Sequence, residues 1–147
     1  MIPALQTVLD VILGITPVPG LSAAFDILKL IVSAVEQASR SKQRLTILAQ
    51  SAAQLLQTLN NEFIASRLAQ SACREPLREL QSLLIDIQTF VRDEQARPFL
   101  KTLFTQDARL EGIDGFYRRI GTVADAFQIS TLLNIQRRLS NDKLACN

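Results

Sequence analysis

Apolar side chains in this chain recur at alternating intervals of three and four residues, and no other feature restricts its fold as strongly. The clearest run consists of Leu77, Leu80, Leu84, Ile87 and Val91. Steps of three and four place side chains on one face of an α-helix, and such a seam packs into left-handed helical bundles. No stretch of more than a few residues alternates between apolar and polar side chains as a strand does. The spacing therefore predicts an all-α protein.

Four long helices follow from the same pattern. They are expected over residues 21–38, 42–69, 75–104 and 107–127. Ser41 is the expected N-cap of the second helix, and Pro98 kinks or ends the third. At 1.5 Å per residue the second and third helices measure roughly 42 Å and 45 Å, so we expect them to form a matched antiparallel hairpin. A last segment with apolar positions from Ile129 to Leu139 extends or follows the fourth helix.

These helices predict an up-and-down four-helix bundle over residues 20–145, with an additional hydrophobic helix before it. The chain has 147 residues, the size of one domain, and no repeat or linker divides it. Five Gly and five Pro are too few for the many turns of a β-sandwich or barrel. We therefore expect a single domain over residues 1–147.

The composition also restricts the chemistry that we expect. There is no His, which removes His-based catalytic triads and imidazole metal sites. The net charge of +2, from 16 basic and 14 acidic residues, is far from the dense positive charge of a nucleic-acid-binding surface. Cys73 and Cys146 are too few for a secreted disulfide scaffold, so we expect reduced thiols inside the cell.

A search for catalytic motifs yields nothing specific. The chain has no Gly-rich nucleotide loop, no Walker motif and no Cys-x-x-Cys pair. Glu75 with Glu79, or Asp107 with Glu111, form carboxylate pairs that are best explained as helix N-terminal charges. Cys73 has no His to activate it. We expect no enzyme activity, no catalytic residue, no cofactor and no metal site.

The N-terminal residues 1–15 predict an amphipathic helix. Its large aliphatic residues are Ile2, Leu5, Val8, Leu9, Val11, Ile12, Leu13 and Ile15. Polar or small residues at positions 3, 6, 7, 10 and 14 form a narrow stripe opposite them. The chain has no Lys or Arg before Lys29, so this is not a signal peptide. Gly14 and Pro17 end the segment before the 20 or so residues that span a bilayer.

Two interpretations of this segment remain open. Eight aliphatic residues contribute roughly −2.4 to −4.8 kcal/mol to insertion, and a central Asp10 costs about +2.5 to +3.5 kcal/mol, so one copy should not span a membrane alone. The segment either lies in a membrane interface, or packs into a groove of the bundle as a core element. The two interpretations are compatible if the helix is docked on the bundle at rest and released on activation.

Three basic residues, Arg40, Lys42 and Arg44, lie close together before and at the start of the second long helix. Each Lys or Arg near an anionic leaflet contributes about 1 kcal/mol, so three bias recruitment to a membrane without anchoring the protein. The alternative is that they are ordinary solvated charges at a helix start.

Several motifs in this pattern resemble a known family. The run Thr16-Pro-Val-Pro-Gly-Leu-Ser-Ala-Ala-Phe25 after a hydrophobic helix is similar to the start of fungal HeLo-like domains. Lys42-Gln-Arg-Leu-Thr-Ile-Leu-Ala49 with Leu55-Leu56, and Asp125-Ala-Phe-Gln-Ile129, resemble later helices of that family. These domains are related to the four-helix bundle of mixed-lineage-kinase-like necroptosis executors and to plant RPW8-type domains.

The resemblance implies a function. HeLo-like domains serve innate immunity and incompatibility: on activation they oligomerise, bind anionic lipids, permeabilise the plasma membrane and cause necroptosis-like cell death. The resemblance implies a cytoplasmic protein that is recruited to the plasma membrane, with a sensor or effector domain in the same or another chain. The implied membrane-inserting residues are Ile2, Leu5, Leu9, Ile12 and Leu13. Gln6 and Asp10 would form the polar face of the helix, and Arg40, Lys42 and Arg44 would contact lipid head groups.

The chain departs from the family pattern in two ways. It has no Gly-rich zipper in the first fifteen residues, and no downstream sensor, kinase or amyloid motif. The 147 residues are thus either the N-terminal domain of a longer protein or an executor that acts alone. The alternative function is a soluble helical adaptor that binds a homologous domain or a coiled-coil partner, with residues 1–15 permanently in the core.

Overall fold

The computed structural model describes residues 14–38, 41–96 and 106–127, together with Gln6, Val8, Asp10 and Ile12. Its helical elements are η1 (Pro19–Leu21), α2 (Ser22–Glu36), α3 (Lys42–Ile64), η2 (Gln70–Cys73), α4 (Arg74–Ala96) and α6 (Gln106–Ala126). These described ranges contain helices and turns but no strand. The prediction of an all-α four-helix bundle is therefore confirmed. Pro98 and the segment from 129 to 139 lie outside the described residues.

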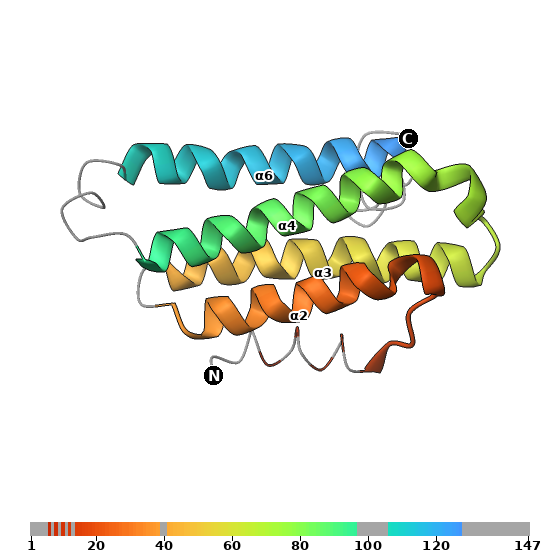
Figure 1. The fold of residues 1–147 in the computed structure, drawn as a ribbon, viewed down its shortest axis with the longest axis horizontal. Coiled ribbons are helices and arrows are strands. Elements are labelled where there is room, and N and C mark those ends of the chain that lie inside the picture. Colours follow the sequence, from red (N-terminus) through yellow and green to blue (C-terminus); the bar gives the residue numbers. More distant parts are fainter. Residues whose placement is uncertain are drawn as a thin grey trace, which may run out of the picture.

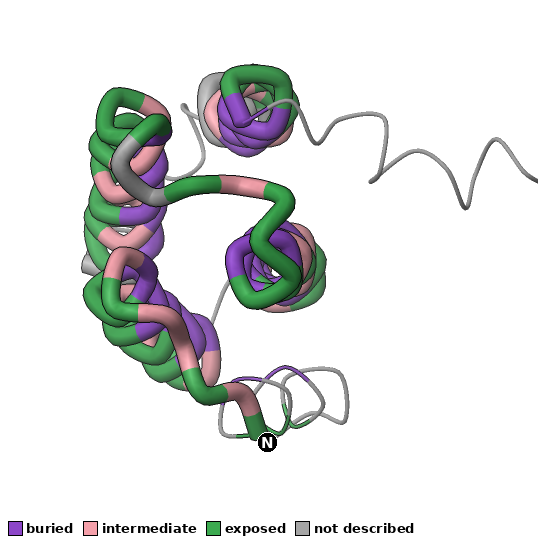
Figure 2. The backbone as a smooth tube through the Cα atoms, turned by 90° about the vertical axis from the view of Figure 1, so that its right-hand side faces the viewer, coloured by how far each residue is buried: buried purple, intermediate pink, exposed green. Residues whose placement is uncertain are grey.

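The four long helices form an elongated bundle in which α2 and α4 run one way and α3 and α6 the other (Figure 1). The neighbouring pairs are α2 with α4, α2 with α3, α3 with α6, and α4 with α6. Consecutive helices α3 and α4 are antiparallel, as expected, but they lie diagonally across the bundle and are not packed as the expected hairpin. The reason is the connection between them, because residues 65–69 cross one end of the bundle (Figure 2).

Helix α3 ends five residues earlier than the predicted residue 69, and the cause is its C-terminal cap. Ser66 has a left-handed backbone, with φ 61°. The Arg67 N–H then donates to the Glu62 carbonyl at 3.0 Å, and the Ser66 N–H donates to the Phe63 carbonyl at 3.1 Å. This pair of hydrogen bonds is a Schellman motif, which closes a helix and turns the chain away from its axis. A Ser at the left-handed position gives no sequence signal as strong as a Gly would.

The core lies along the inward faces of the four helices (Figure 2). In α4 the predicted seam is buried at Leu80, Leu84, Ile87 and Val91 and half-buried at Leu77. Two edge-to-face aromatic pairs stabilise the bundle. Phe63 of α3 packs on Phe127, the residue after α6, at 6.4 Å between ring centroids, and Phe90 of α4 packs on Phe116 of α6 at 5.3 Å. Such pairs add to the stabilisation that burial of apolar area provides.

Among the residues that the structure describes, no helix is both long enough and apolar enough to cross a bilayer.

Candidate functional site

The described residues at the N-terminus have helical backbone and differ sharply in burial. Gln6, Val8, Asp10, Ile12 and Gly14, here called the N-terminal segment, all have helical backbone conformation. Val8 and Ile12 are only 4% and 2% exposed and belong to the same buried cluster as the four helices. Gln6, Asp10 and Gly14 are exposed. The segment thus rests on the bundle through its apolar side and turns its polar side outward.

The polar side has its own hydrogen bond. The Gln6 amide Nε2 donates to Asp10 Oδ1 at 3.0 Å, one helical turn apart. Side chains four residues apart on a helix surface stabilise it by a few tenths of a kcal/mol. Both residues of the expected polar face are therefore exposed in the docked arrangement. Of the five residues expected to enter the membrane, Ile12 is buried against the bundle, and Ile2, Leu5, Leu9 and Leu13 lie outside the described residues.

Residues 15–18, here called the linker, join this segment to η1. A buried side chain of α3 holds the linker in place. The Val18 N–H donates to Asn60 Oδ1 at 2.8 Å, and Asn60 Nδ2 donates to the Thr16 carbonyl at 3.3 Å. Asn60 is only 2% exposed. Sequence reasoning missed Asn60, although a signal exists. Thr46, Ala53 and Asn60 are seven residues apart and so share one flank of α3, where a buried amide needs a partner from another segment.

The basic residues at the other end of the bundle are in different environments. Lys42 is half-buried, and its ammonium Nζ donates to the Glu36 carbonyl at 2.7 Å. It therefore satisfies a carbonyl at the C-terminus of α2 and places a positive charge at the negative end of that helix. Arg44 is exposed and makes no ion pair with any residue that the structure describes. Arg40 lies outside the described residues.

A second buried polar group closes the C-terminus of α3. The Glu62 carboxylate, 5% exposed, accepts hydrogen bonds from Arg67 Nε at 3.0 and 2.9 Å and from Nη2 at 2.6 Å. These hydrogen bonds, with the nearby negative charge, raise the pKa of the Arg67 guanidinium. Removing the arginine would leave a buried carboxylate unpaired, which costs more than the pair contributes.

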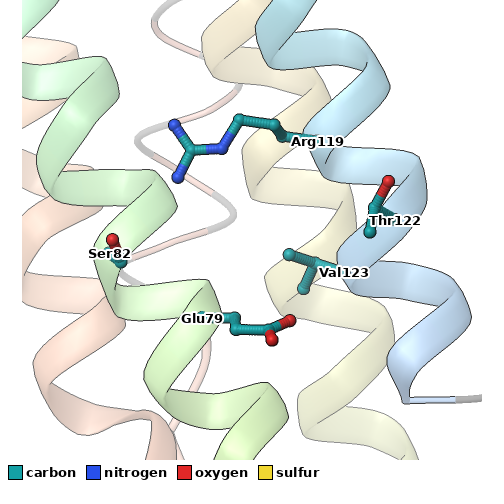
Figure 3. Close-up of a pocket in the computed structure, with 5 residues that line it drawn as sticks. All are labelled: Glu79, Ser82, Arg119, Thr122 and Val123. Carbon is teal, nitrogen blue, oxygen red and sulfur yellow. The ribbon is translucent and has the colours of Figure 1, made fainter.

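A shallow pocket of about 300 Å³ lies between α4 and α6 (Figure 3). Its lining residues are Glu79, Ser82, Arg119, Thr122 and Val123. Arg119 already pairs with Asp86, with Nη1 and Oδ2 at 2.8 Å, and its guanidinium carbon lies 6.0 Å from the Phe116 ring centroid. The Thr122 hydroxyl donates to the Arg118 carbonyl at 3.0 Å. The lining holds the hydroxyls of Ser82 and Thr122 and the carboxylate of Glu79, and no hydrogen bond joins either hydroxyl to this carboxylate.

The structure also describes Cys73 and Glu75, two reactive groups that the sequence analysis considered. Cys73 is buried, and burial raises the pKa of its thiol, which keeps it protonated and poorly nucleophilic. Glu75 pairs with Arg78 at 3.1 Å, as a helix N-terminal charge would. Across the described ranges, no group of three or more Cys, Asp or Glu side chains could hold a metal ion.

Comparison of the chain with protein-family models, with curated proteins and with solved structures finds no significant match. The most distinctive arrangement among the described residues is the N-terminal segment docked on the bundle, with its linker held by Asn60.

Proposed function

We propose that this chain is a membrane-permeabilising cell-death domain of the immune or incompatibility type, which inserts its N-terminal helix into the plasma membrane after oligomerisation. One observation carries the proposal. Val8 and Ile12 are buried against the bundle, while Gln6, Asp10 and Gly14 on the opposite side are exposed. A segment with one apolar and one polar side can bury its apolar side in either of two places. These are the bundle at rest and a lipid interface after release.

The energetics of such a release are moderate. Full burial of a large aliphatic side chain stabilises by about 1.5–3 kcal/mol, so exposing Val8 and Ile12 to water costs roughly 3–6 kcal/mol. A cost of this size keeps the segment docked in solution. Transfer of the same side chains into a bilayer also removes them from water and is therefore favourable. Contact with lipid thus shifts the equilibrium from the docked to the released segment.

Asp10 explains why oligomerisation belongs to the proposal. A carboxylate at the centre of an inserted helix is costly when one copy faces hydrocarbon on all sides. Several copies can turn Asp10, together with Gln6, toward a shared aqueous lumen. The proposed partners are therefore anionic lipids and further copies of the chain, with a sensor or effector domain as the source of activation. Arg44 and Arg40 are the proposed head-group contacts. Lys42 is the weaker candidate because its ammonium is bound to the Glu36 carbonyl.

Dye leakage from vesicles with and without anionic lipid tests the proposal. Residues 1–147 should release dye when anionic lipid is present, and a chain that begins at Pro17 should not, with helical circular dichroism retained in both. Leu9→Glu should abolish leakage, because it places a charge on the expected lipid face. Gln6→Glu, which adds the same charge to the exposed polar side, is the matched control. Equal loss of leakage in both variants would contradict the assigned faces.

The second candidate is a soluble helical adaptor that binds a homologous domain or a coiled-coil partner. The near-complete burial of Val8 and Ile12, at 4% and 2% exposed, favours it, because such residues also suit a permanent core element. If both chain lengths stay folded and monomeric and neither causes leakage, the adaptor is the better description. Loss of helicity on removing residues 1–16 would support it further.

A further inference from the structure

Three buried polar side chains lie in the described part of the chain, and all three belong to α3. Two of them are satisfied locally. The Thr46 hydroxyl donates to the Lys42 carbonyl at 2.7 Å, and the Glu62 carboxylate is bound by Arg67. Asn60 differs, because its two partners lie 42 and 44 residues earlier in the sequence, in the linker. The hydrogen bonding of Asn60 therefore depends on whether the linker is docked.

The linker offers Asn60 a restricted choice of partners. Pro17 and Pro19 have no N–H, so Val18 supplies the one backbone donor within this tripeptide. Asn60 Oδ1 accepts that donor, and Asn60 Nδ2 binds the Thr16 carbonyl on the other side of Pro17. A single amide thus holds the linker at two points, as a neighbouring strand would. Val18 also accepts a hydrogen bond from the Leu21 N–H at 2.9 Å, which connects the clamp to η1.

The two hydrogen bonds of Asn60 connect detachment of the linker with detachment of the N-terminal segment. Detachment of the linker breaks both hydrogen bonds of the Asn60 amide at once, and these polar groups are costly to leave without partners. Opening is cheaper when water replaces both lost partners of the Asn60 amide. The N-terminal segment directly precedes the linker in the chain, and the Ile15 N–H donates to the Ile12 carbonyl at 3.4 Å. Linker and segment are therefore expected to detach together.

We propose that Asn60 is a latch that ties release of the N-terminal segment to hydration of the α3 flank and so sets the population of the released state. The use of that release for membrane insertion rests on the proposed function. The latch itself is a property of the folded chain and can be measured without lipid.

Hydrogen exchange of residues 1–147, followed by mass spectrometry, tests the latch. In Asn60→Ala, exchange in the peptide containing Ile12 and Val18 should become roughly tenfold faster, as expected for the loss of two buried hydrogen bonds. Peptides from the centre of α4 should exchange as in the wild type. The matched control is Asn61→Ala, whose side chain is exposed one position along the helix. Equal rates in the two variants, or faster exchange throughout the chain, would overturn the latch.

A second variant reaches the same hydrogen bond from the linker side, in case Asn60→Ala does not fold. Val18 has φ −63° and ψ 155°, which proline adopts without strain. Val18→Pro therefore removes the N–H that donates to Asn60 Oδ1, and it changes no residue of α3. It should also speed exchange around Ile12. The double variant should add less than the sum of the two single changes, because both act on one hydrogen bond. Full additivity would contradict the latch.

Leakage measured on the same variants separates the latch from the proposed function. Faster exchange together with more leakage at equal lipid supports both. Faster exchange with no leakage from any variant leaves the latch standing and contradicts membrane permeabilisation. Leakage from the wild type, with unchanged exchange in both variants, keeps the proposed function and overturns the latch.

Discussion

Cε2 of the Phe90 ring lies against the backbone of Gly112, so close that a β-carbon on Gly112 would stand 3.1 Å from it. Gly112 belongs to α6 and Phe90 to α4, and the Phe90 ring also packs edge-to-face on Phe116. The missing side chain thus allows the two helices to approach at this point. Gly121, on the same helix, has nothing within 4 Å of where its β-carbon would be.

The two glycines should therefore respond oppositely to alanine. Gly121→Ala should raise the free energy of unfolding by about 0.5–1 kcal/mol, because alanine loses less backbone entropy in a helix. Gly112→Ala should lower it, because the Phe90 ring must shift and the gain in helix propensity does not offset the strain. Urea denaturation of both variants gives the comparison. Equal stabilisation by both would mean that the Phe90 contact does not restrict this position.

Leu84 is the centre of the α4 seam and has no exposed surface. Leu84→Ala should cost about 2–5 kcal/mol of stability, through lost burial and the cavity that remains. The neighbouring Ile85 is 48% exposed, so Ile85→Ala should change stability by no more than about 0.5 kcal/mol. Thermal or urea unfolding measures both. A similar cost for the two would contradict the orientation of α4.

Arg44 and Arg74 provide a charge-matched test of the head-group contacts. They begin helices at opposite ends of the bundle, α3 and α4 respectively, and both are exposed (Figure 1). Arg44→Gln should weaken binding to anionic vesicles roughly fivefold, since one basic residue near such a leaflet contributes about 1 kcal/mol. Arg74→Gln removes the same charge and should leave binding nearly unchanged. Vesicle co-sedimentation at low salt measures both, and equal weakening would point to net charge instead of a defined face.

Burial of the Cys73 thiol makes stability depend on pH in the alkaline range. Its pKa is raised above the ordinary value of 9.0, so the folded state holds the proton more tightly than the unfolded state does. The contribution to stability is fully present below pH 9.0 and is lost as the pH rises through the raised pKa. The Tm of the wild type should therefore fall above that pH more steeply than the Tm of Cys73→Ala. Identical slopes for the two chains would contradict a buried, protonated thiol.

Ionisation of Tyr117 should also lower the stability of the fold, at a higher pH than ionisation of Cys73. Its pKa is raised above 10.0, first by burial, with an opposing hydrogen bond to Ser51 and a smaller effect of the Asp114 charge. Tyr117→Phe should remove the part of the alkaline loss that sets in above pH 10.0. The comparison of Tm against pH for this variant and the wild type checks it. No difference between them would contradict the raised pKa.

The repeat of apolar residues by itself determined that this chain is helical and which faces are buried. The α4 seam shows why, because steps of three and four fix one face of a helix whatever lies opposite. The same local rule predicted exposure of Gln6 and Asp10 on one side of the N-terminal segment, and both are exposed. The predicted first residues of two helices, 42 and 75, also lie within one residue of the observed starts, which are Lys42 for α3 and Arg74 for α4.

Only the tertiary structure decided which helices are neighbours and which polar groups find partners. The diagonal placement of α3 and α4 depends on the Schellman turn at Ser66, which redirects the chain across the bundle end. Lys42 carries the same charge as Arg44, but its ammonium donates a hydrogen bond to the carbonyl of Glu36, which folding brings within reach. Asn60 acquires its role because the fold returns Thr16 and Val18 to it over more than forty residues. Periodicity describes one helix at a time, whereas these pairings depend on how the helices are connected and packed.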